Sequence, residues 1–452
     1  MNEQWTKLFE KTKLNVDQIT DISESIFFAD LHDQAFKTIF FDEHHNKTIK
    51  SKFQKYLFAA DDESNSILRI KEREEFQNKV LKIERINKHQ HRILPALLFF
   101  TRPISGVELC FLMPTWCSGK IDLAAFKKAL ELFRITFPSE AITLQDEKDG
   151  LVQIDLKTED NNLDRVFALT SFQTNIESWK ALVADRSRDP DPERYHRLSE
   201  LINSILRCKK NIDYVLFPEL SIPRSIVVAI ATRLITRNIS LVTGVEYEKL
   251  AVPPNYPPTF KGIVKNQLIY FLAIKRSRLI GQVCIIQEKV TAAQDEAKDL
   301  YQEGGKILIA TDEKKYLVNH GGLFLSGLIC NDLLNIDYRK NLRGKIDALI
   351  VIEWNKDVET YDALITATAN DLHCFAFQVN NRLYGDTRLR APYKESYMRD
   401  RVRVRGGELD YFVVAGIEVK KLREFQSKHV STDQDFKPVP TGFEISPERK
   451  IK

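Results

Sequence analysis

Three reactive side chains stand at the ends of short apolar runs in the second half of the chain: Glu219 in "LFPEL", Lys289 in "CIIQEK" and Cys330 in "GLIC". Apolar runs of this length, bounded by turn residues, predict buried β-strands. A thiol attacks only as the thiolate, so it needs a base to take its proton and a cation to favour the anion. A carboxylate, an amine and a thiol at three strand ends therefore indicate nucleophilic catalysis.

Each of these residues also has an ordinary structural explanation. Glu219 could cap a helix that begins near Ser221. Lys289 could be solvated at the end of its strand, and Cys330 could be a small core residue. The strand-to-helix step after Cys330 favours the catalytic interpretation, because free backbone N–H groups at such a step stabilise both a thiolate and an oxyanion.

The elements that must position these residues follow residue 162. At least ten short apolar runs occur there, with helical stretches among them. One helix is predicted to begin at Pro192 after the N-cap Asp191, and others to follow Ser221, Leu333 and Val358. Strands with helices inserted among them indicate a layered α/β architecture, and this many strands favours two stacked sheets over one.

Several stretches occur in an order that matches a known family: "FALTSFQTN", "VLFPEL", "QEKVTAAQDEAKDLYQEGGKILI", "GLICNDLLNIDYRKNLRGKIDALIV" and "FQVNNRLYGDTRLRAP". They resemble the first strand, the glutamate, lysine and cysteine motifs, and the pocket-closing loop of the nitrilase superfamily, the carbon–nitrogen hydrolases. The resemblance covers roughly residues 165–426. It implies a four-layer α-β-β-α sandwich.

The resemblance also implies a role for each reactive residue. Cys330 would attack a carbonyl or nitrile carbon and form a thioester, with Glu219 as the general base. Lys289 and the backbone N–H of Asn331 would stabilise the oxyanion, and Glu296 would position Lys289 or the substrate. The activity implied is hydrolysis of a small-molecule amide or nitrile, with no cofactor and no metal.

The chain departs from the family pattern beside the nucleophile and after the next strand. Asn331 follows Cys330 where the family often has an aromatic residue. The stretch "IEWNKD" stands where the family often has a proline and small residues. Glu353, Trp354 and Asn355 are therefore predicted to line the substrate pocket and to alter the leaving group or the acyl part. A scaffold that has kept the fold and lost the activity is the alternative.

Composition shifts predict three regions. Between Glu140 and Asp164 there are eight acidic residues against two lysines, and apolar periodicity is weak. We interpret this segment as a junction between a small α+β region of unknown role, residues 1–160, and a hydrolase domain, residues 163–426. Residues 427–452 are predicted to be a polar tail.

Composition and cysteine usage predict a cytoplasmic protein. With 43% hydrophobic and 29% charged residues the chain has an ordinary globular composition, and a net charge of +4 gives no global nucleic-acid signature. The start is polar, and no apolar run approaches the roughly 18 residues of a membrane span. Six scattered cysteines without a CxxC pair suit reduced thiols. His89 and His91 lack further ligands, so no metal site is expected.

The run "MRDRVRVRGG" places arginines at every second position: Arg399, Arg401, Arg403 and Arg405. On a strand these four would share one face. Such a face is often merely solvated. Alternatively, it would bind an anionic partner: nucleic acid phosphate, an acidic substrate, or an acidic surface of a second subunit.

The stretch from "NNRLYGDTRLRAP" to "VKKLREFQ" also resembles the nitrilase-like modules attached to bacterial reverse transcriptases of phage-defence type, although no polymerase motif is present. Two functions therefore remain open. The first is a thiol hydrolase that works as a homodimer or larger homo-oligomer. The alternative is a binding or effector module that uses the scaffold and the arginines to engage nucleic acid or a partner protein.

Overall fold

The computed structural model describes residues 142–145, 150–160, 162–186, 188–252, 257, 259–276, 279–428 and 435–451. The chain divides into two compact units, Met1–Phe137 and Pro138–Lys452. All described residues belong to the second unit. The predicted α+β region lies outside the described residues up to residue 141, and so do His89 and His91.

One sheet of the described residues has eight strands in the order β1-β2-β9-β10-β11-β12-β13-β14. Its central strands β10, β11 and β12 run parallel, and every residue in them is buried. Burial on both faces explains why they appear in the sequence as continuous apolar runs. The strands are β1 (Ile142–Leu144), β2 (Leu151–Leu156), β9 (Lys315–His320), β10 (Leu323–Ile329), β11 (Ala348–Glu353), β12 (Phe375–Asn380), β13 (Thr387–Arg390) and β14 (Asp400–Val404).

The second sheet of the described residues has seven strands: the path β15-β3-β4-β5-β6-β7, with β8 paired to β6. Strands β3, β4 and β5 are parallel, and antiparallel neighbours flank them. The strands are β3 (Arg165–Ser171), β4 (Tyr214–Ile222), β5 (Ser240–Leu250), β6 (Gly262–Arg276), β7 (Leu279–Glu288), β8 (Lys306–Leu308) and β15 (Tyr411–Ile417).

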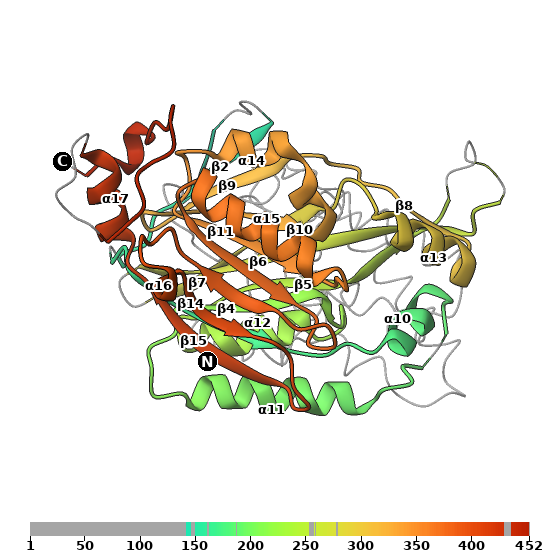
Figure 1. Ribbon diagram of the computed structural model, residues 1–452. Coiled ribbons are helices and arrows are strands. Elements are labelled where there is room, and N and C mark those ends of the chain that lie inside the picture. Colours follow the sequence, from blue (N-terminus) through green and yellow to red (C-terminus); the bar gives the residue numbers. More distant parts are fainter. Residues whose placement is uncertain are drawn as a thin grey trace, which may run out of the picture. The chain divides into compact units, whose positions relative to one another are not determined.

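Helices cover the outer faces of the two sheets. Figure 1 shows α11 and α12 on one side of the molecule and α14 and α15 on the other, with the strands between them. The predicted four-layer α-β-β-α sandwich is therefore confirmed. The helices are α10 (Ile176–Val183), α11 (Glu193–Arg207), α12 (Val227–Ile235), α13 (Gln294–Gly304), α14 (Ile336–Leu342), α15 (Val358–Asp371), α16 (Ser396–Arg399) and α17 (Val419–Ser427), with 3-10 helices η3 (Cys330–Leu334) and η4 (Pro447–Arg449).

Aromatic side chains join the two sheets. The ring of Phe167 in β3 stacks on Tyr214 of the same sheet at 4.7 Å and packs against Phe377 of the other sheet at 4.3 Å. The Tyr214 hydroxyl and the His320 ring share a hydrogen bond between the sheets. Burial of such rings contributes large apolar areas, so the sheet-to-sheet interface is the main core of the domain.

The acidic segment before residue 164 is not a linker. Strand β2 pairs in parallel with β9, from Leu151 opposite Lys315 to Leu156 opposite His320. The domain boundary predicted at residues 160–163 is therefore wrong, and the second compact unit begins at Pro138. The sequence misleads here because the partner strand lies far along the chain, and nearby acidic residues obscure the apolar alternation of "LVQIDL".

The segment predicted to be a polar tail packs onto the domain over its described residues, 435–451. The Phe436 ring stacks on Tyr393 at 4.7 Å. Arg449 is fully buried, and its Nη2 and Nε donate to Asp347 Oδ1 at 2.8 and 3.0 Å. Arginine in a polar stretch is usually solvated, and here a buried carboxylate brings it inside. The prediction of a free tail is wrong for these residues.

Candidate active site

Glu219 lies where β4 departs from regular strand geometry. Pairing of β4 with β5 is regular up to Phe217 and resumes at Ile222. Leu220 has a φ of +53°, which residues other than glycine rarely adopt. A Cβ on Gly244 of β5 would lie 2.4 Å from the Cα of Glu219, so only glycine fits there. Backbone strain of this kind is typical of functional sites.

Three donors hold the Glu219 carboxylate. Lys289 Nζ and Asn266 Nδ2 donate to Oε1 at 2.9 and 2.6 Å, and the backbone N–H of Trp354 donates to Oε2 at 2.8 Å. Strand β4 continues past Glu219, and α12 begins only after it, so Glu219 does not cap that helix. Burial raises the pKa of Glu219 above its ordinary value, although the Lys289 ammonium opposes this. A carboxylate with a raised pKa is a stronger base.

Lys289 directly follows β7 and places its ammonium between two carboxylates. Its Nζ lies 2.9 Å from Glu219 Oε1 and 2.6 Å from Glu296 Oε2. Burial lowers the pKa of Lys289, but the two carboxylates raise it to well above its ordinary value. Burial raises the pKa of Glu296, yet Lys289 and a hydrogen bond from Tyr247 bring it below its ordinary value. Lys289 and Glu296 therefore form an ion pair beside Glu219.

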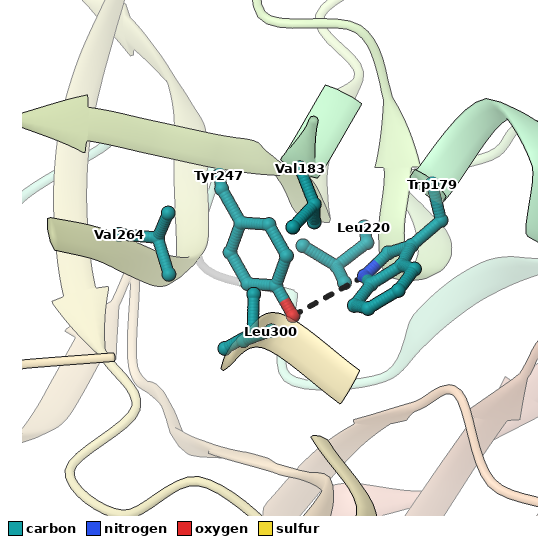
Figure 2. Packing of buried hydrophobic residues seen from close by; sticks show 6 residues of the cluster. All are labelled: Trp179, Val183, Leu220, Tyr247, Val264 and Leu300. Carbon is teal, nitrogen blue, oxygen red and sulfur yellow. Dashed lines mark hydrogen bonds between the residues drawn. The ribbon is translucent and has the colours of Figure 1, made fainter. Parts of the chain in front are cut away.

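A small apolar cluster supports this ion pair. Figure 2 shows Trp179, Val183, Leu220, Tyr247, Val264 and Leu300 packed together. The Trp179 indole N–H lies 3.3 Å from the Tyr247 hydroxyl, which in turn donates to Glu296 Oε1 at 2.7 Å. The cluster therefore fixes the direction in which Tyr247 presents its hydroxyl to Glu296.

Cys330 is the first residue after β10 and opens η3. Its φ is +44°, so the nucleophile candidate sits on a tight, strained turn at a strand end. It is 6% exposed, and its Sγ lies 3.8 Å from the Tyr361 hydroxyl of α15. Burial raises the pKa of the thiol well above its ordinary value, and the Glu219 carboxylate raises it further against the Lys289 ammonium. Cys330 is therefore a thiol at rest and needs a base to become a nucleophile.

A second buried ion pair holds the turn that carries Cys330. Lys315 Nζ in β9 lies 2.7 Å from Asp332 Oδ2 in η3, and both side chains are at most 2% exposed. The same ammonium donates to the Glu288 carbonyl oxygen at 3.1 Å. Because Glu288 precedes Lys289, Lys315 ties the nucleophile turn to the lysine strand.

The three residues predicted to line the pocket lie at or just after the end of β11. Trp354 touches Glu219 directly through its backbone N–H. Glu353 is fully buried and accepts a hydrogen bond from Gln378 Nε2 at 2.8 Å. The backbone N–H of Asn355 donates to Asn380 Oδ1 at 2.9 Å, which fixes the loop. The structure thus places Trp354 against Glu219 and Glu353 near Cys330, and their contact with substrate stays a prediction.

Two site residues escaped the sequence interpretation. Asn266 donates to both Glu219 and Glu296, at 2.6 and 3.2 Å. The polar run "KNQ" inside an apolar strand was the signal that could have found it. Tyr361, beside Cys330, gave no signal, because it occupies a helical position that looks like ordinary core.

The arginine stripe is not one strand face. Strand β14 covers Asp400–Val404, so Arg399 belongs to α16 and Arg405 follows the strand. Arg399 donates to the backbone carbonyls of Tyr393 and Lys394. The prediction that all four arginines share one strand face is therefore wrong.

The arginines of β14 differ in how far their charge is matched. Arg403 pairs with Asp386 at 2.6 Å and with Asp362 at 3.0 Å. Arg401 is exposed and lies over the Tyr393 ring at 5.6 Å. Anion binding therefore stays a prediction for Arg401 and Arg405 and loses its support at Arg403.

Within the described residues, no group of three or more His, Cys, Asp or Glu side chains is arranged to hold a metal ion. No helix in that part of the chain is long and apolar enough to cross a membrane.

No protein-family model matches the chain, and no curated protein matches it in sequence. Several solved structures are similar to part of the chain. A CN-hydrolase superfamily protein of Xanthomonas campestris, with an arsenic adduct in its active site, is 14% identical over 58% of this chain and 94% of its own, with a TM-score of 0.40. Nit3 of Saccharomyces cerevisiae, a member of branch 10 of the nitrilase superfamily, is 12% identical over 62% and 99%, with a TM-score of 0.41. An amidase mutant of Nesterenkonia sp. AN1, with the acetamide moiety of fluoroacetamide on its active-site cysteine, is 15% identical over 57% and 92%, with a TM-score of 0.39.

Proposed function

We propose that this chain is a thiol hydrolase that cleaves a non-peptide C–N bond through a cysteine thioester. An amide is the favoured substrate, with a nitrile or carbamoyl compound as the alternative. The observation that carries the proposal is the Lys289 ammonium, which is held between Glu219 and Glu296. It lies close enough to Cys330, on its strained strand end, to interact electrostatically with that side chain.

The first half of the reaction forms the thioester. Glu219 takes the proton from Cys330 Sγ, and the sulfur attacks the carbonyl carbon, so that a C–S bond forms and the carbonyl electron pair moves onto oxygen. An ammonium has three N–H donors, and Lys289 uses two of them on Glu219 and Glu296. The third, together with the backbone N–H of Asn331, would stabilise the oxyanion.

The second half releases the products. The tetrahedral intermediate collapses, the C–N bond breaks, and Glu219 returns its proton to the departing nitrogen, which leaves as ammonia or an amine. Water then gives a proton to Glu219 and attacks the thioester. The C–S bond breaks, the carboxylic acid leaves, and Glu219 returns the proton from water to the sulfur, so the site regains its starting state.

The test measures the rate at which iodoacetamide alkylates each cysteine as a function of pH, with peptide mass analysis. We expect Cys330 to react faster than the buried Cys284 and Cys374, and to lose this advantage in Glu219→Gln. Ammonia release from a panel of linear amides should then disappear in Cys330→Ala and persist in the matched control Cys208→Ala. If Cys330 reacts no faster than the buried cysteines, and any ammonia release is the same in Cys330→Ala as in the unmodified chain, the hydrolase proposal fails. The binding module then takes its place.

A further inference from the structure

Glu353, the last residue of β11, has one carboxylate oxygen that accepts no hydrogen bond from any described residue. Its side chain is fully buried. Oε2 accepts a hydrogen bond from Gln378 Nε2 at 2.8 Å. Oε1 is buried and has no hydrogen-bond partner within the part of the chain that the structure describes. An unpaired buried carboxylate oxygen is costly, so its presence calls for an explanation.

This carboxyl group stands next to the nucleophile. Strands β10 and β11 are parallel neighbours whose last pair is Ile329 and Ile352, and the next residues along the two strands are Cys330 and Glu353. Charge on Glu353 raises the pKa of both Cys330 and Tyr361, so the three side chains lie within one another's electrostatic reach. Glu353 therefore lies close to Cys330, near enough for its charge to act on the thiol.

The cations near Glu353 are already matched by other acids. Arg388 of β13 donates to Gln378 Oε1 at 2.8 Å and forms its ion pair with Asp362. Lys289 is shared by Glu219 and Glu296. Among the described residues, no ion pair joins Glu353 to a cation. The buried region around Cys330 thus holds more carboxyl groups than cations.

A second unused acceptor belongs to the same region. Asn266 spends its amide Nδ2 on Glu219 and Glu296. Its Oδ1 is buried and has no hydrogen-bond partner among the described residues. Glu353 and Asn266 therefore each keep one buried acceptor oxygen without a donor among the described residues.

We propose that Glu353 is a specificity-determining residue that binds a positively charged N–H group of the substrate, so that the substrate is an amide carrying an ammonium, amidinium or guanidinium group near its scissile bond. This inference rests on the hydrolase proposed above. Such a group would bring the counter-charge that the buried carboxyls lack and the donor that Oε1 lacks. A neutral or anionic substrate would leave Oε1 unpaired.

The test uses two thiol reagents of matched length and opposite charge, 2-aminoethyl and 2-sulfonatoethyl methanethiosulfonate. Their rate constants are measured on the full chain by peptide mass analysis at a pH above about 8, where Glu353 carries its charge. Half-buried Cys208 is the internal reference for the intrinsic reactivity of each reagent. We expect the cation-to-anion ratio at Cys330 to exceed that at Cys208 by about tenfold or more, and to fall about tenfold in Glu353→Gln.

Glu359→Gln is the matched control, because it removes the same charge from an exposed position on α15. The ratio at Cys330 should not change in this variant. Equal ratios in the unmodified chain and Glu353→Gln overturn the inference alone, provided that Cys330 reacts. If Cys330 does not react with either reagent ahead of Cys284 and Cys374, the hydrolase proposal fails as well, and the two failures are distinct.

A measurement on the unmodified chain guards against a variant that fails to fold. Burial raises the pKa of Glu353 to about 8, and Glu219 and Asp386 raise it while Gln378 and Arg388 lower it. A cation must displace the proton of Glu353 below this value. The ratio of the Cys330 rate constants for a trimethylammonium reagent, whose charge is permanent, and for the sulfonate reagent should therefore rise with pH. It should level off above about 8. A preference that stays flat or falls overturns the inference.

Discussion

The backbone N–H of Trp354 donates to Glu219 Oε2 at 2.8 Å, and this bond links the loop after β11 in one sheet to the irregular part of β4 in the other. Strand β4 carries Glu219, the proposed base, and the loop after β11 carries its donor. The position of the base therefore depends on how the sheets stack. Lys289 and Asn266 donate to the other oxygen, Oε1, so both oxygens of the Glu219 carboxylate are held in place.

Replacing Glu219 with Gln should silence the nucleophile while keeping the packing. Glutamine fills the same volume but cannot take the thiol proton, so alkylation of Cys330 by iodoacetamide at neutral pH should slow about 10²-fold. In the unmodified chain, Cys330 reactivity should be lost as the pH falls through the raised pKa of Glu219, because the protonated carboxyl is no base. A variant that retains its rate within about twofold would remove Glu219 from the mechanism.

Two lysine–carboxylate pairs at similar distances allow a comparison of burial. Lys289→Met leaves Glu219 and Glu296 buried without their cation, so the free energy of unfolding should fall by about 3–5 kcal/mol. Lys356 pairs with Asp295 at 2.8 Å, but both side chains are largely exposed. Lys356→Met should therefore leave the urea midpoint unchanged, since exposed pairs contribute little. An equal loss of unfolding free energy in Lys289→Met and Lys356→Met would contradict the role assigned to Lys289.

The stability of the domain should decline with pH because of Glu353. The pKa of this group is raised from its ordinary 4.5 to about 8 in the folded protein. Between these values the unfolded chain has lost the proton and the folded protein keeps it, so stability falls as the pH rises and levels off above the folded value. Melting temperatures measured across this range should decline less in Glu353→Gln than in the unmodified chain and Glu359→Gln. Parallel declines in all three would contradict this assignment.

The segment around η4 should stabilise the whole domain. Arg449 and Arg423 both bind the buried carboxylate of Asp347, whose pKa they hold below its ordinary value in spite of burial. Arg449→Ala should lower the free energy of unfolding by about 3 kcal/mol, as measured by urea titration. The exposed neighbour Lys450 supplies the control, and Lys450→Ala should unfold at the same urea concentration as the unmodified chain. If Arg449→Ala does not change the free energy of unfolding, Arg423 alone is enough to balance the charge of Asp347.

The sequence was informative where chemistry and strand ends coincide. Glu219, Lys289 and Cys330 each stand at the end of an apolar run, although they come from both sheets, with β4 and β7 in one sheet and β10 in the other. Tyr361 and the pairing of β2 with β9 could not be predicted, because both depend on contacts between segments distant in the chain. Arg403 was misjudged for a related reason: its partners Asp386 and Asp362 come from other elements.

The parallel pairing of β2 with β9 has a mechanical consequence for the nucleophile. Leu151 lies opposite Lys315, and Lys315 holds Asp332 in the turn that carries Cys330. A force applied to the start of β2 would therefore be transmitted through the hydrogen bonds between β2 and β9 and then through the Lys315–Asp332 ion pair. The Cys330 thiol is thus two non-covalent links away from β2, and we expect a displacement of that strand to alter the turn that carries Cys330.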